Sequence, residues 1–597
     1  MKKLLHFFTK LKPYWVTLFL LFSIIYLCSY RWQKENITSI ITSDGIGYYE
    51  YLQAVFNDNN LDHLKENEIY TNTTNNGKNY IKYTCGVAIL ILPFFLIAHF
   101  IEFLLKVEQS GFSEISHVLI SLSSLFYLIL GLIFLNQLMK IYTINLKNRI
   151  ISILFIFFGT NLFYYTYIYS SSSHVFSFFA IASFLLSSKK YVFFHNQKHL
   201  YLSSILLALI VLIRPTNVVV IFIVPFLAGS FEELKKTAFH FFKNKTQAFF
   251  SFLIFGSIIF IQPILWYVQT GFFYVKPYND EGFYLSNPQF LKLLFSFRKG
   301  LFVYSPILLF LFVGVAFIFK KSKYQFFTIT FFLIAVSYLF AAWWNWYYGD
   351  SFGQRVFIDY YSIAALLIAI GLEDVKQYAL RISVLFIGSI FLIFNLFQTY
   401  QYCAGIIHPY NMDAAKYKYI FLKFNSKYKF VLGGNKDLEP YGFYPKKLIY
   451  STKNNFEKSY KNWHGDNIVS VENNSYYSYK NSEWGATFTM QNDTAFYNSR
   501  KLFVTASINR IEFENGSSLG AYFVVNTQNK DGKTLYYSAF PINDYPDNEA
   551  CKWRKYNYSF IVPKQKFIDN KLLIYICNPA KGNFAIDDFE MNIYKIY

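Results

Sequence analysis

Long apolar segments alternate with short polar connections over the first 403 residues of the chain. Residues 150–188 contain no Lys, Arg, Asp or Glu. A helix needs roughly 20 apolar residues to cross a bilayer, so this stretch alone can cross twice. The pattern predicts a polytopic α-helical membrane domain over residues 1–403. Its apolar segments are 13–30, 83–105, 116–139, 150–169, 171–188, 201–213, 215–230, 247–270, 301–319, 324–344, 357–372 and 382–403.

Basic residues gather in six clusters between these segments, and such clusters are typical of cytoplasmic loops. All six can be cytoplasmic only if 83–105 does not cross and if 201–213 and 215–230 cross separately, which gives about eleven crossings. Segment 83–105 would then be a re-entrant or surface helix pair broken at Pro93. The alternative lets 83–105 cross and joins 201–230 into one helix kinked at Arg214-Pro215, with two clusters outside. The first topology is preferred, although 13 residues span only about 20 Å, short of a roughly 30 Å hydrocarbon core. The clusters are Lys2/Lys3/Lys10/Lys12, Lys140/Lys147/Arg149, Lys189/Lys190/Lys198, Lys235/Lys236/Lys243/Lys245, Lys320/Lys321/Lys323 and Lys376/Arg381.

Both topologies place the same loops outside the cytoplasm, namely 31–82, 271–300 and 345–356, together with everything after residue 403. The basic N-terminus leads into the apolar run from Trp15 to Tyr30 without a small-residue cleavage site. It is therefore interpreted as an uncleaved first helix.

The chain changes character after residue 403, where it becomes polar and rich in Asn and Tyr. Short alternating runs such as LFVTASINRIEF and KTLYYSAF are separated by turn signals at Asn515-Gly516 and Asp531-Gly532. This pattern predicts an all-β sandwich over 465–597, with 404–464 as a connecting segment. The sandwich resembles the jelly rolls of carbohydrate-binding modules.

Composition agrees with a membrane protein, since 54% of the residues are hydrophobic and 22% are aromatic. The net charge of +20 does not indicate nucleic-acid binding, because the basic residues lie between apolar segments and no such motif is present. The five cysteines show no CxxC and no zinc spacing. Cys551 and Cys577 could form a disulfide outside the cytoplasm or could be two buried thiols.

Asp44 and Glu50 lie in TSDGIGYYEYL, just past the first predicted helix. Ser43-Asp44-Gly45 can begin a short helix, and Glu50 then lies on another face. A carboxylate at this place can be a catalytic base or a helix cap at the membrane interface.

Further polar residues are predicted at the same outer face of the membrane, each with a structural alternative. Lys82 could bind a phosphate or anchor a helix, and His174 could contact a substrate or another helix. Arg355 can bind phosphate in bidentate fashion, or it can form an ion pair with Asp359 one helical turn away. The remaining candidates are Arg214, which is costly in a membrane unless paired or hydrated, Arg298 and Asp350.

Two of these motifs resemble the GT-C glycosyltransferases, such as the protein O-mannosyltransferases and the lipid A aminoarabinose transferase. Asp44 with Tyr48 and Tyr49 is similar to the first external loop of that family, and the resemblance implies that Asp44 is the base. Lys82-Tyr-Thr-Cys-Gly86 resembles the K-x-P-x-G stretch of the family, with Thr84 in place of Pro, which implies a lysine near the lipid phosphate. The overall residue pattern of 159–179, GTNLFYYTYIYSSSSHVFSFF, resembles that of membrane glycosyltransferase-like proteins of Bacteroidetes.

The resemblance implies an inverting transferase of a bacterial inner membrane. It would move a sugar from a polyprenyl-phosphate donor to a periplasmic glycan, lipid or protein, and the C-terminal domain would be periplasmic. Catalysis would use Asp44 and Glu50, with Lys82, His174, Arg214, Arg298, Asp350 and Arg355 binding substrate or lipid phosphate. No cofactor is required, because the protein supplies the cations, although a divalent cation remains compatible. No Rossmann fingerprint or P-loop is present.

The alternative function is a non-catalytic membrane protein, either a transporter of lipid-linked glycans or a scaffold for the sandwich. A transporter places its polar groups near the middle of the bilayer, whereas these gather near one surface. An Asp44 that points away from Arg355 would favour the alternative.

Overall fold

The computed structural model describes residues 40–64, 70–278, 281–434, 446–458, 460–471, 474–491, 501–543, 549–563 and 571–596. The predicted first helix at 13–30 lies outside the described residues. Within them, a helical domain runs to Cys403, and an all-β domain begins at Lys446.

The helical domain also contains a small hairpin of β1 (Thr71–Thr73) and β2 (Asn79–Ile81). Its helices are α3 (Asp44–Phe56), α4 (Gly86–Leu105), α5 (Glu114–Ile141), α6 (Leu146–Phe158), α7 (Leu162–Tyr167), α8 (Ser173–Phe194), α9 (Gln197–Ile213), η2 (Pro215–Ile223), α10 (Val224–Ala228), α11 (Phe231–Lys243), α12 (Lys245–Ile259), α13 (Ile261–Thr270), α14 (Phe290–Phe295), α15 (Leu301–Tyr304), η3 (Pro306–Phe310), α16 (Leu311–Lys321), α17 (Lys323–Ala341), η4 (Arg355–Tyr360), α18 (Tyr361–Asp374) and α19 (Tyr378–Cys403).

Seven of the described helices are long and apolar enough to cross a membrane, or up to eight if the bent pair of 215–228 and 231–243 is one span. They identify a multi-pass membrane protein, and the expected number of about eleven crossings stays a prediction. The bent pair turns by 119°, so the chain does not continue straight through Gly229.

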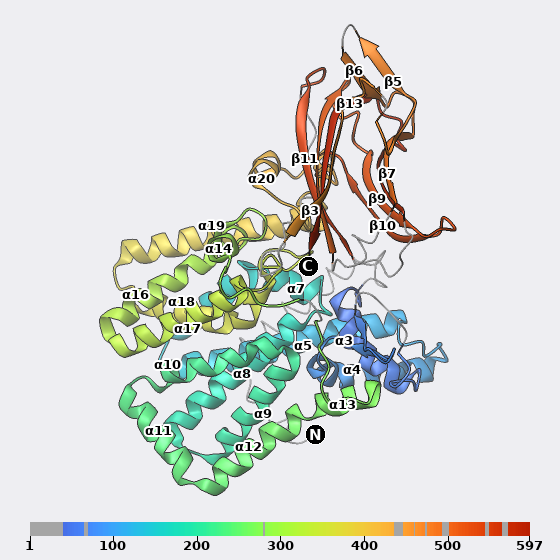
Figure 1. The fold of residues 1–597 in the computed structure, drawn as a ribbon. Coiled ribbons are helices and arrows are strands. Elements are labelled where there is room, and N and C mark those ends of the chain that lie inside the picture. Colours follow the sequence, from blue (N-terminus) through green and yellow to red (C-terminus); the bar gives the residue numbers. More distant parts are fainter. Residues whose placement is uncertain are drawn as a thin grey trace.

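The predicted cytoplasmic loops meet at one end of the helical domain. There the Lys189 ammonium, on α8, donates to the Leu227 carbonyl of α10 at 2.7 Å. Lys321, on α16, pairs with Asp374 of α18 at 2.5 Å. Arg381 donates to Asn148 at 2.8 Å, which joins α19 to α6. Figure 1 shows the α10–α11 corner far from the sandwich.

Helix α4 has both of its flanks beside the segment that begins α3. Before α4, the Tyr83 hydroxyl donates to Asp44 at 2.7 Å. After α4, His117 accepts a hydrogen bond from the Ile41 amide at 3.1 Å, and the Tyr49 hydroxyl donates to the Gly111 carbonyl at 2.6 Å. Helix α4 itself runs unbroken from Gly86 to Leu105 and includes Pro93, so the expected helix pair broken at Pro93 is not found. It is one of the seven helices long and apolar enough to cross, and the expectation that 83–105 does not cross stays a prediction.

The β-domain consists of two antiparallel sheets whose inner faces share one hydrophobic core. Phe523 contacts Phe589 across it, with ring centroids 5.8 Å apart. One sheet has the order β10-β9-β12-β7-β4 and the other β11-β8-β13-β6-β5, with β3 also paired to β13. The strands are β3 (Lys446–Asn454), β4 (Trp463–His464), β5 (Ile468–Val471), β6 (Asn474–Ser478), β7 (Trp484–Gln491), β8 (Lys501–Glu512), β9 (Tyr522–Gln528), β10 (Thr534–Pro541), β11 (Arg554–Pro563), β12 (Lys571–Cys577) and β13 (Phe584–Ile596).

This sandwich begins earlier than the predicted residue 465, because β3 completes the sheet beside the long strand β13. Residues 404–434 contain α20 (Ala414–Ile420) and η5 (Ser426–Tyr428). Ile406, Ile407 and Ile420 pack there against Tyr304 of the helical domain. Cys551 is exposed, Cys577 is half-buried, and both thiols are free, so neither the disulfide nor the pair of buried thiols is found.

Candidate active site

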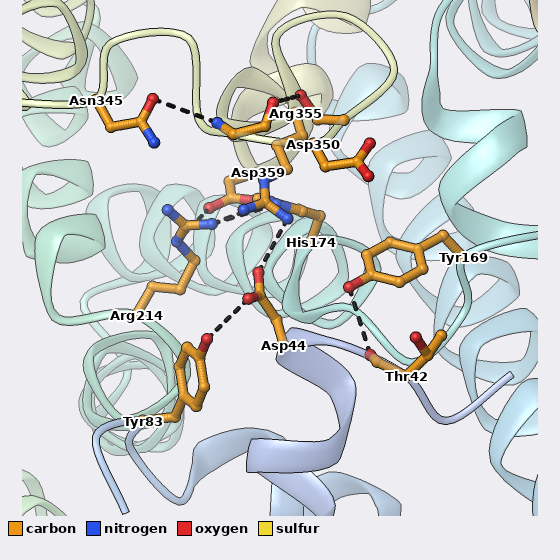
Figure 2. Close-up of polar contacts among 12 residues, drawn as sticks. Thr42, Asp44, Tyr83, Tyr169, His174, Arg214, Asn345, Asp350, Arg355 and Asp359 are labelled. Atoms are coloured by element: carbon orange, nitrogen blue, oxygen red, sulfur yellow. Dashed lines mark hydrogen bonds and ion pairs between the residues drawn. The ribbon is translucent and has the colours of Figure 1, made fainter. Parts of the chain in front are cut away.

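Asp44 begins helix α3 and points toward Arg355 (Figure 2). Its Oδ2 lies 2.9 Å from Nη1 of Arg355, and its Oδ1 accepts a hydrogen bond from the Tyr83 hydroxyl at 2.7 Å. Gly45 allows this placement, because a Cβ there would lie 2.1 Å from the Ser171 hydroxyl oxygen. The side chain of Asp44 is 26% exposed, so the carboxylate remains reachable.

The surroundings of Asp44 hold it in the ionised form. Burial raises the pKa of this carboxyl, but Arg355, the Tyr83 hydroxyl and Lys82 together bring the pKa below its ordinary value. An opposite charge close to a carboxylate favours the charged form. Asp44 is therefore a carboxylate at neutral pH, as a proton acceptor must be.

The Arg355–Asp359 ion pair, the structural alternative for these two residues, is absent. Both lie in η4, which is a 3-10 helix, and in that geometry residues i and i+4 lie on different faces because three residues complete a turn. Arg355 therefore contacts Asp44, while Asp359 faces His174 and Arg214. The turn before η4 uses Gly353, with φ of 61°.

Asp359 is the centre of a second, buried cluster beside the first. His174 Nδ1 lies 2.8 Å from Asp359 Oδ1, and Arg214 Nε lies 3.5 Å from Oδ2. The Asn217 amide donates to Oδ2 at 2.7 Å and accepts from the Tyr360 hydroxyl at 3.1 Å. Asp359 is fully buried, whereas the Arg214 side chain is 20% exposed.

Local sequence explains why Arg214 turns into this cluster. Helix α9 ends at Ile213 because Pro215 follows two residues later, and a residue before proline avoids the helical region. Arg214 has φ of −151° and ψ of 109°, an extended conformation that directs the side chain away from the α9 axis. Its Nη1 lies 3.2 Å from His174 Nδ1 and 3.3 Å from Nε2.

Lys82 lies close to the Asp44–Arg355 pair and adds a further positive charge there. It contributes to lowering the pKa of Asp44, and its ammonium lies 5.3 Å from the centre of the Tyr83 ring. Within the described part of the chain, no carboxylate forms an ion pair with Lys82. Its charge is therefore available to an anionic ligand.

The other predicted residues lie around this centre rather than in it. Glu50 is on α3, about 9 Å along the helix axis from Asp44 at 1.5 Å per residue. The Arg298 guanidinium is 3.9 Å from the centre of the Tyr347 ring and 5.1 Å from that of Tyr410, which suits a structural role. Asp350 is exposed and accepts a hydrogen bond from the Tyr402 hydroxyl at 3.0 Å.

Tyr83, Asn217 and Lys299 belong to this region but were not among the sequence candidates. Tyr83 and Asn217 each lie within three residues of a predicted cation, and this nearness was the only available signal. Lys299 is buried and donates to the carbonyls of Ser351 and Pro409.

No three or more His, Cys, Asp or Glu side chains come together in a group that could hold a metal ion among the residues that the structure describes. The region offers the ionised Asp44 carboxylate beside the Arg355 guanidinium, and the Asp359 carboxylate beside His174 and Arg214. The cofactor requirement stays a prediction.

Asp359→Asn is expected to destabilise the protein by about 3 kcal/mol, because removing one partner of a buried ion pair leaves the other charge uncompensated. The thermal unfolding of the solubilised protein measures this effect. Asp374→Asn is the matched control, since Asp374 pairs with Lys321, whose side chain is 64% exposed. That change is expected to cost less than about 1 kcal/mol. Equal losses for the two variants would contradict the role assigned to Asp359.

Comparison with known proteins identifies no relative by sequence. No protein-family model matches the chain, and no curated protein matches it. Among solved structures, the cryo-EM structure of arabinosyltransferase EmbB from Mycobacterium smegmatis is similar over 81% of this chain, with 10% identity and a TM-score of 0.31. This chain spans 57% of the length of that protein. At this score the similarity assigns neither a fold nor an activity to the chain.

Proposed function

We propose that this chain is a membrane glycosyltransferase of the GT-C type, which moves a sugar from a polyprenyl-phosphate donor to an acceptor hydroxyl. The observation that carries the proposal is the contact between Asp44 and Arg355, with Lys82 and Arg214 close by. A carboxylate base surrounded by cations suits a reaction in which a proton is removed and a phosphate leaves.

The proposal gives Asp44, Arg355 and Lys82 one role each, which the contact between Asp44 and Arg355 supports. Asp44 takes the proton of the acceptor hydroxyl, and the acceptor oxygen attacks the anomeric carbon. The bond between that carbon and the phosphate oxygen breaks, and its electrons leave with the polyprenyl phosphate. Arg355 and Lys82 stabilise the charge that develops on the phosphate, and attack from the opposite face inverts the anomeric centre.

Arg355 has two possible partners in this scheme, Asp44 before the donor binds and the phosphate afterwards. The guanidinium forms bidentate hydrogen bonds to phosphate. When Arg355 turns to the phosphate, Asp44 loses much of the positive field that lowers its pKa, so its basicity rises. The donor would thus activate the base that the reaction needs.

The side of the membrane follows from the positions of the basic residues. If the Lys189, Lys321 and Arg381 end is cytoplasmic, as the positive-inside rule favours, the Asp44 end is periplasmic in a bacterial inner membrane. The eleven crossings would then be the first helix, α5, α6–α7, α8, α9, η2–α10, α12–α13, η3–α16, α17, η4–α18 and α19. Lipid-linked donors are the sugar donors available on that side.

Reconstitution into proteoliposomes tests the activity. Polyprenyl-phosphate donors carrying a hexose, a pentose or an amino sugar are supplied with envelope glycans of the native cell as acceptors, and release of polyprenyl phosphate is measured. The proposal expects release from at least one donor that depends on the acceptor. No release from any donor, together with movement of the lipid-linked sugar across the bilayer, would favour a transporter instead.

A further inference from the structure

A cavity of 590 Å³ lies between the helical domain and the β-sandwich. The helical domain contributes residues from α7 and α19 together with Asp350 and Ser351, and the 404–434 segment contributes six more. The sandwich contributes Tyr522 of β9 and Pro541 of β10. Its volume falls within the usual range of small-molecule sites, about 300–1,000 Å³. Neither domain forms the cavity alone.

The walls of this cavity combine aromatic rings with a carboxylate. Tyr164, Tyr165, Tyr169, Tyr402 and Tyr522 all line it, and the rings of Tyr164 and Tyr402 meet edge to face at 5.2 Å. Tyr rings present an apolar face together with a polar hydroxyl. The Asp350 carboxylate, which also lines the cavity, is exposed and offers several acceptor positions, of which Tyr402 occupies one.

The cavity extends to the segment that directly precedes the proposed base. Thr42 and Ser43, the two residues before Asp44, line it, and the Tyr169 hydroxyl lies 3.4 Å from the Thr42 carbonyl (Figure 2). A molecule that fills the cavity therefore ends next to the first turn of α3.

The loops around the cavity are cross-linked. Lys299 donates to the carbonyls of Ser351 and Pro409, and so ties two lining loops together. His408 Nδ1 accepts from the backbone amides of Tyr410 at 3.2 Å and Asn411 at 2.9 Å. Burial lowers the pKa of His408 to about 3. The ring is therefore neutral near pH 7, and Nδ1 can accept these hydrogen bonds.

The sandwich is held at the cavity by hydrogen bonds of its own. The Gly434 amide donates to the Pro541 carbonyl at 2.9 Å, and the Asn543 amide donates to the Val431 carbonyl at 2.8 Å. The wall that Tyr522 and Pro541 supply is thus fixed to the segment that follows α19. Cavities with such supported walls bind without a large ordering cost.

We propose that this cavity binds the glycan part of the acceptor, so that the acceptor is a carbohydrate chain whose end hydroxyl reaches Asp44. This inference rests on the proposed transferase function. A sugar ring has an apolar C–H face that packs on aromatic rings and hydroxyls that donate to carboxylates, and the cavity offers both. Tyr402 and Asp350 would bind the sugar from the helical domain, and Tyr522 from the sandwich.

A second cavity has the apolar lining expected of a site for hydrocarbon and so differs from the first. It has a volume of 430 Å³ and is lined mainly by Phe, Leu, Ile and Val side chains of α14 to α18, among them Phe302, Leu311 and Phe332. No charged side chain lines that cavity. The Tyr- and Asp-lined cavity is therefore the one suited to a polar, hydroxyl-rich ligand.

Glycan binding by the full chain in nanodiscs tests the inference. The probe is the pool of oligosaccharides released from the envelope of the native cell by mild acid and labelled at the reducing end. We expect the wild type to retain a subset of this pool. Asp350→Asn and Tyr522→Ala are each expected to weaken retention roughly tenfold, the effect of one lost contact to a charged group or an aromatic ring.

Tyr537→Ala is the matched control for Tyr522→Ala. Tyr537 is on β10, next to β9, and is 57% exposed, against 37% for Tyr522, and it does not line the cavity. Retention by this variant should equal that of the wild type. Failure of the wild type to retain any oligosaccharide, or equal retention by all variants, would overturn the inference.

The outcomes for the cavity and for the transferase are separable. Retention of glycans that depends on Asp350 and Tyr522, without sugar transfer, would keep the glycan site and reject the transferase. Sugar transfer with an acceptor KM that neither substitution changes would keep the transferase and reject the glycan site.

Discussion

Replacing Asp44 with Asn is expected to reduce the rate of sugar transfer by about 10²- to 10⁴-fold, the usual contribution of a general base. The amide has nearly the same shape as the carboxylate but cannot take a proton from the acceptor hydroxyl. It can still accept the hydrogen bond that the Tyr83 hydroxyl now donates to Asp44, so the fold around α3 should persist. Single-turnover transfer in proteoliposomes measures the loss directly.

Asp58→Asn provides the matched control for this substitution. Asp58 lies just after α3 in the same loop and is exposed, so the same chemical change there should leave the transfer rate within about twofold of the wild type, as expected for a surface site without special contacts. A folded Asp44→Asn protein that transfers at the wild-type rate would remove Asp44 as the base.

Arg355→Gln is expected to weaken catalysis and also to change its pH dependence. The lost contact with the donor phosphate should lower kcat/KM by about 10- to 100-fold, the range for a hydrogen bond to a charged group. Burial raises the pKa of Asp44, and Arg355 is the first of the groups that lower it. Without Arg355 the pKa of Asp44 therefore rises, and the acidic limb of kcat/KM moves to higher pH.

The direction of this shift distinguishes the account from a simple loss of structure. Because the wild-type pKa of Asp44 lies below its ordinary value of 3.8, kcat/KM of the wild type should not fall through protonation of Asp44 above about pH 5, roughly one unit above that value. Arg355→Gln should show such a fall within the measured range. Arg381→Gln, at the opposite end of the helical domain, should keep the wild-type profile. If the acidic limb of kcat/KM in Arg355→Gln stayed at the wild-type pH or moved to lower pH, this would contradict the coupling between Arg355 and Asp44.

The apolar pattern predicts the helical domain well because each membrane helix needs a continuous apolar stretch. It could not predict which polar residues meet, because Asp44, Arg214 and Arg355 come from segments more than a hundred residues apart. Sequence spacing was misleading for Arg355 and Asp359, since a 3-10 helix replaced the α-helix that the i, i+4 spacing assumes.

Local sequence identified candidate residues at the outer face, but it could not show which partner each of them contacts. Asp44 and Arg355 were both selected from their motifs, and the structure brings them into contact. Arg298 was selected in the same way but stacks on Tyr347, since the arrangement of the 343–350 loop cannot be read from its sequence. The sandwich boundary moved to Lys446 for a similar reason, because β3 pairs with β13 over a separation of about 140 residues.

The most direct test is an experimental structure of the full chain in a nanodisc with polyprenyl phosphate, the leaving group of the proposed reaction. The account predicts that the phosphate lies within hydrogen-bond distance of Arg355 and close to Lys82, and that Arg355 has turned at least one nitrogen from Asp44 to the phosphate. A phosphate bound at the end of the helical domain that carries Lys189 and Lys321, with the Asp44–Arg355 contact unchanged, would contradict it.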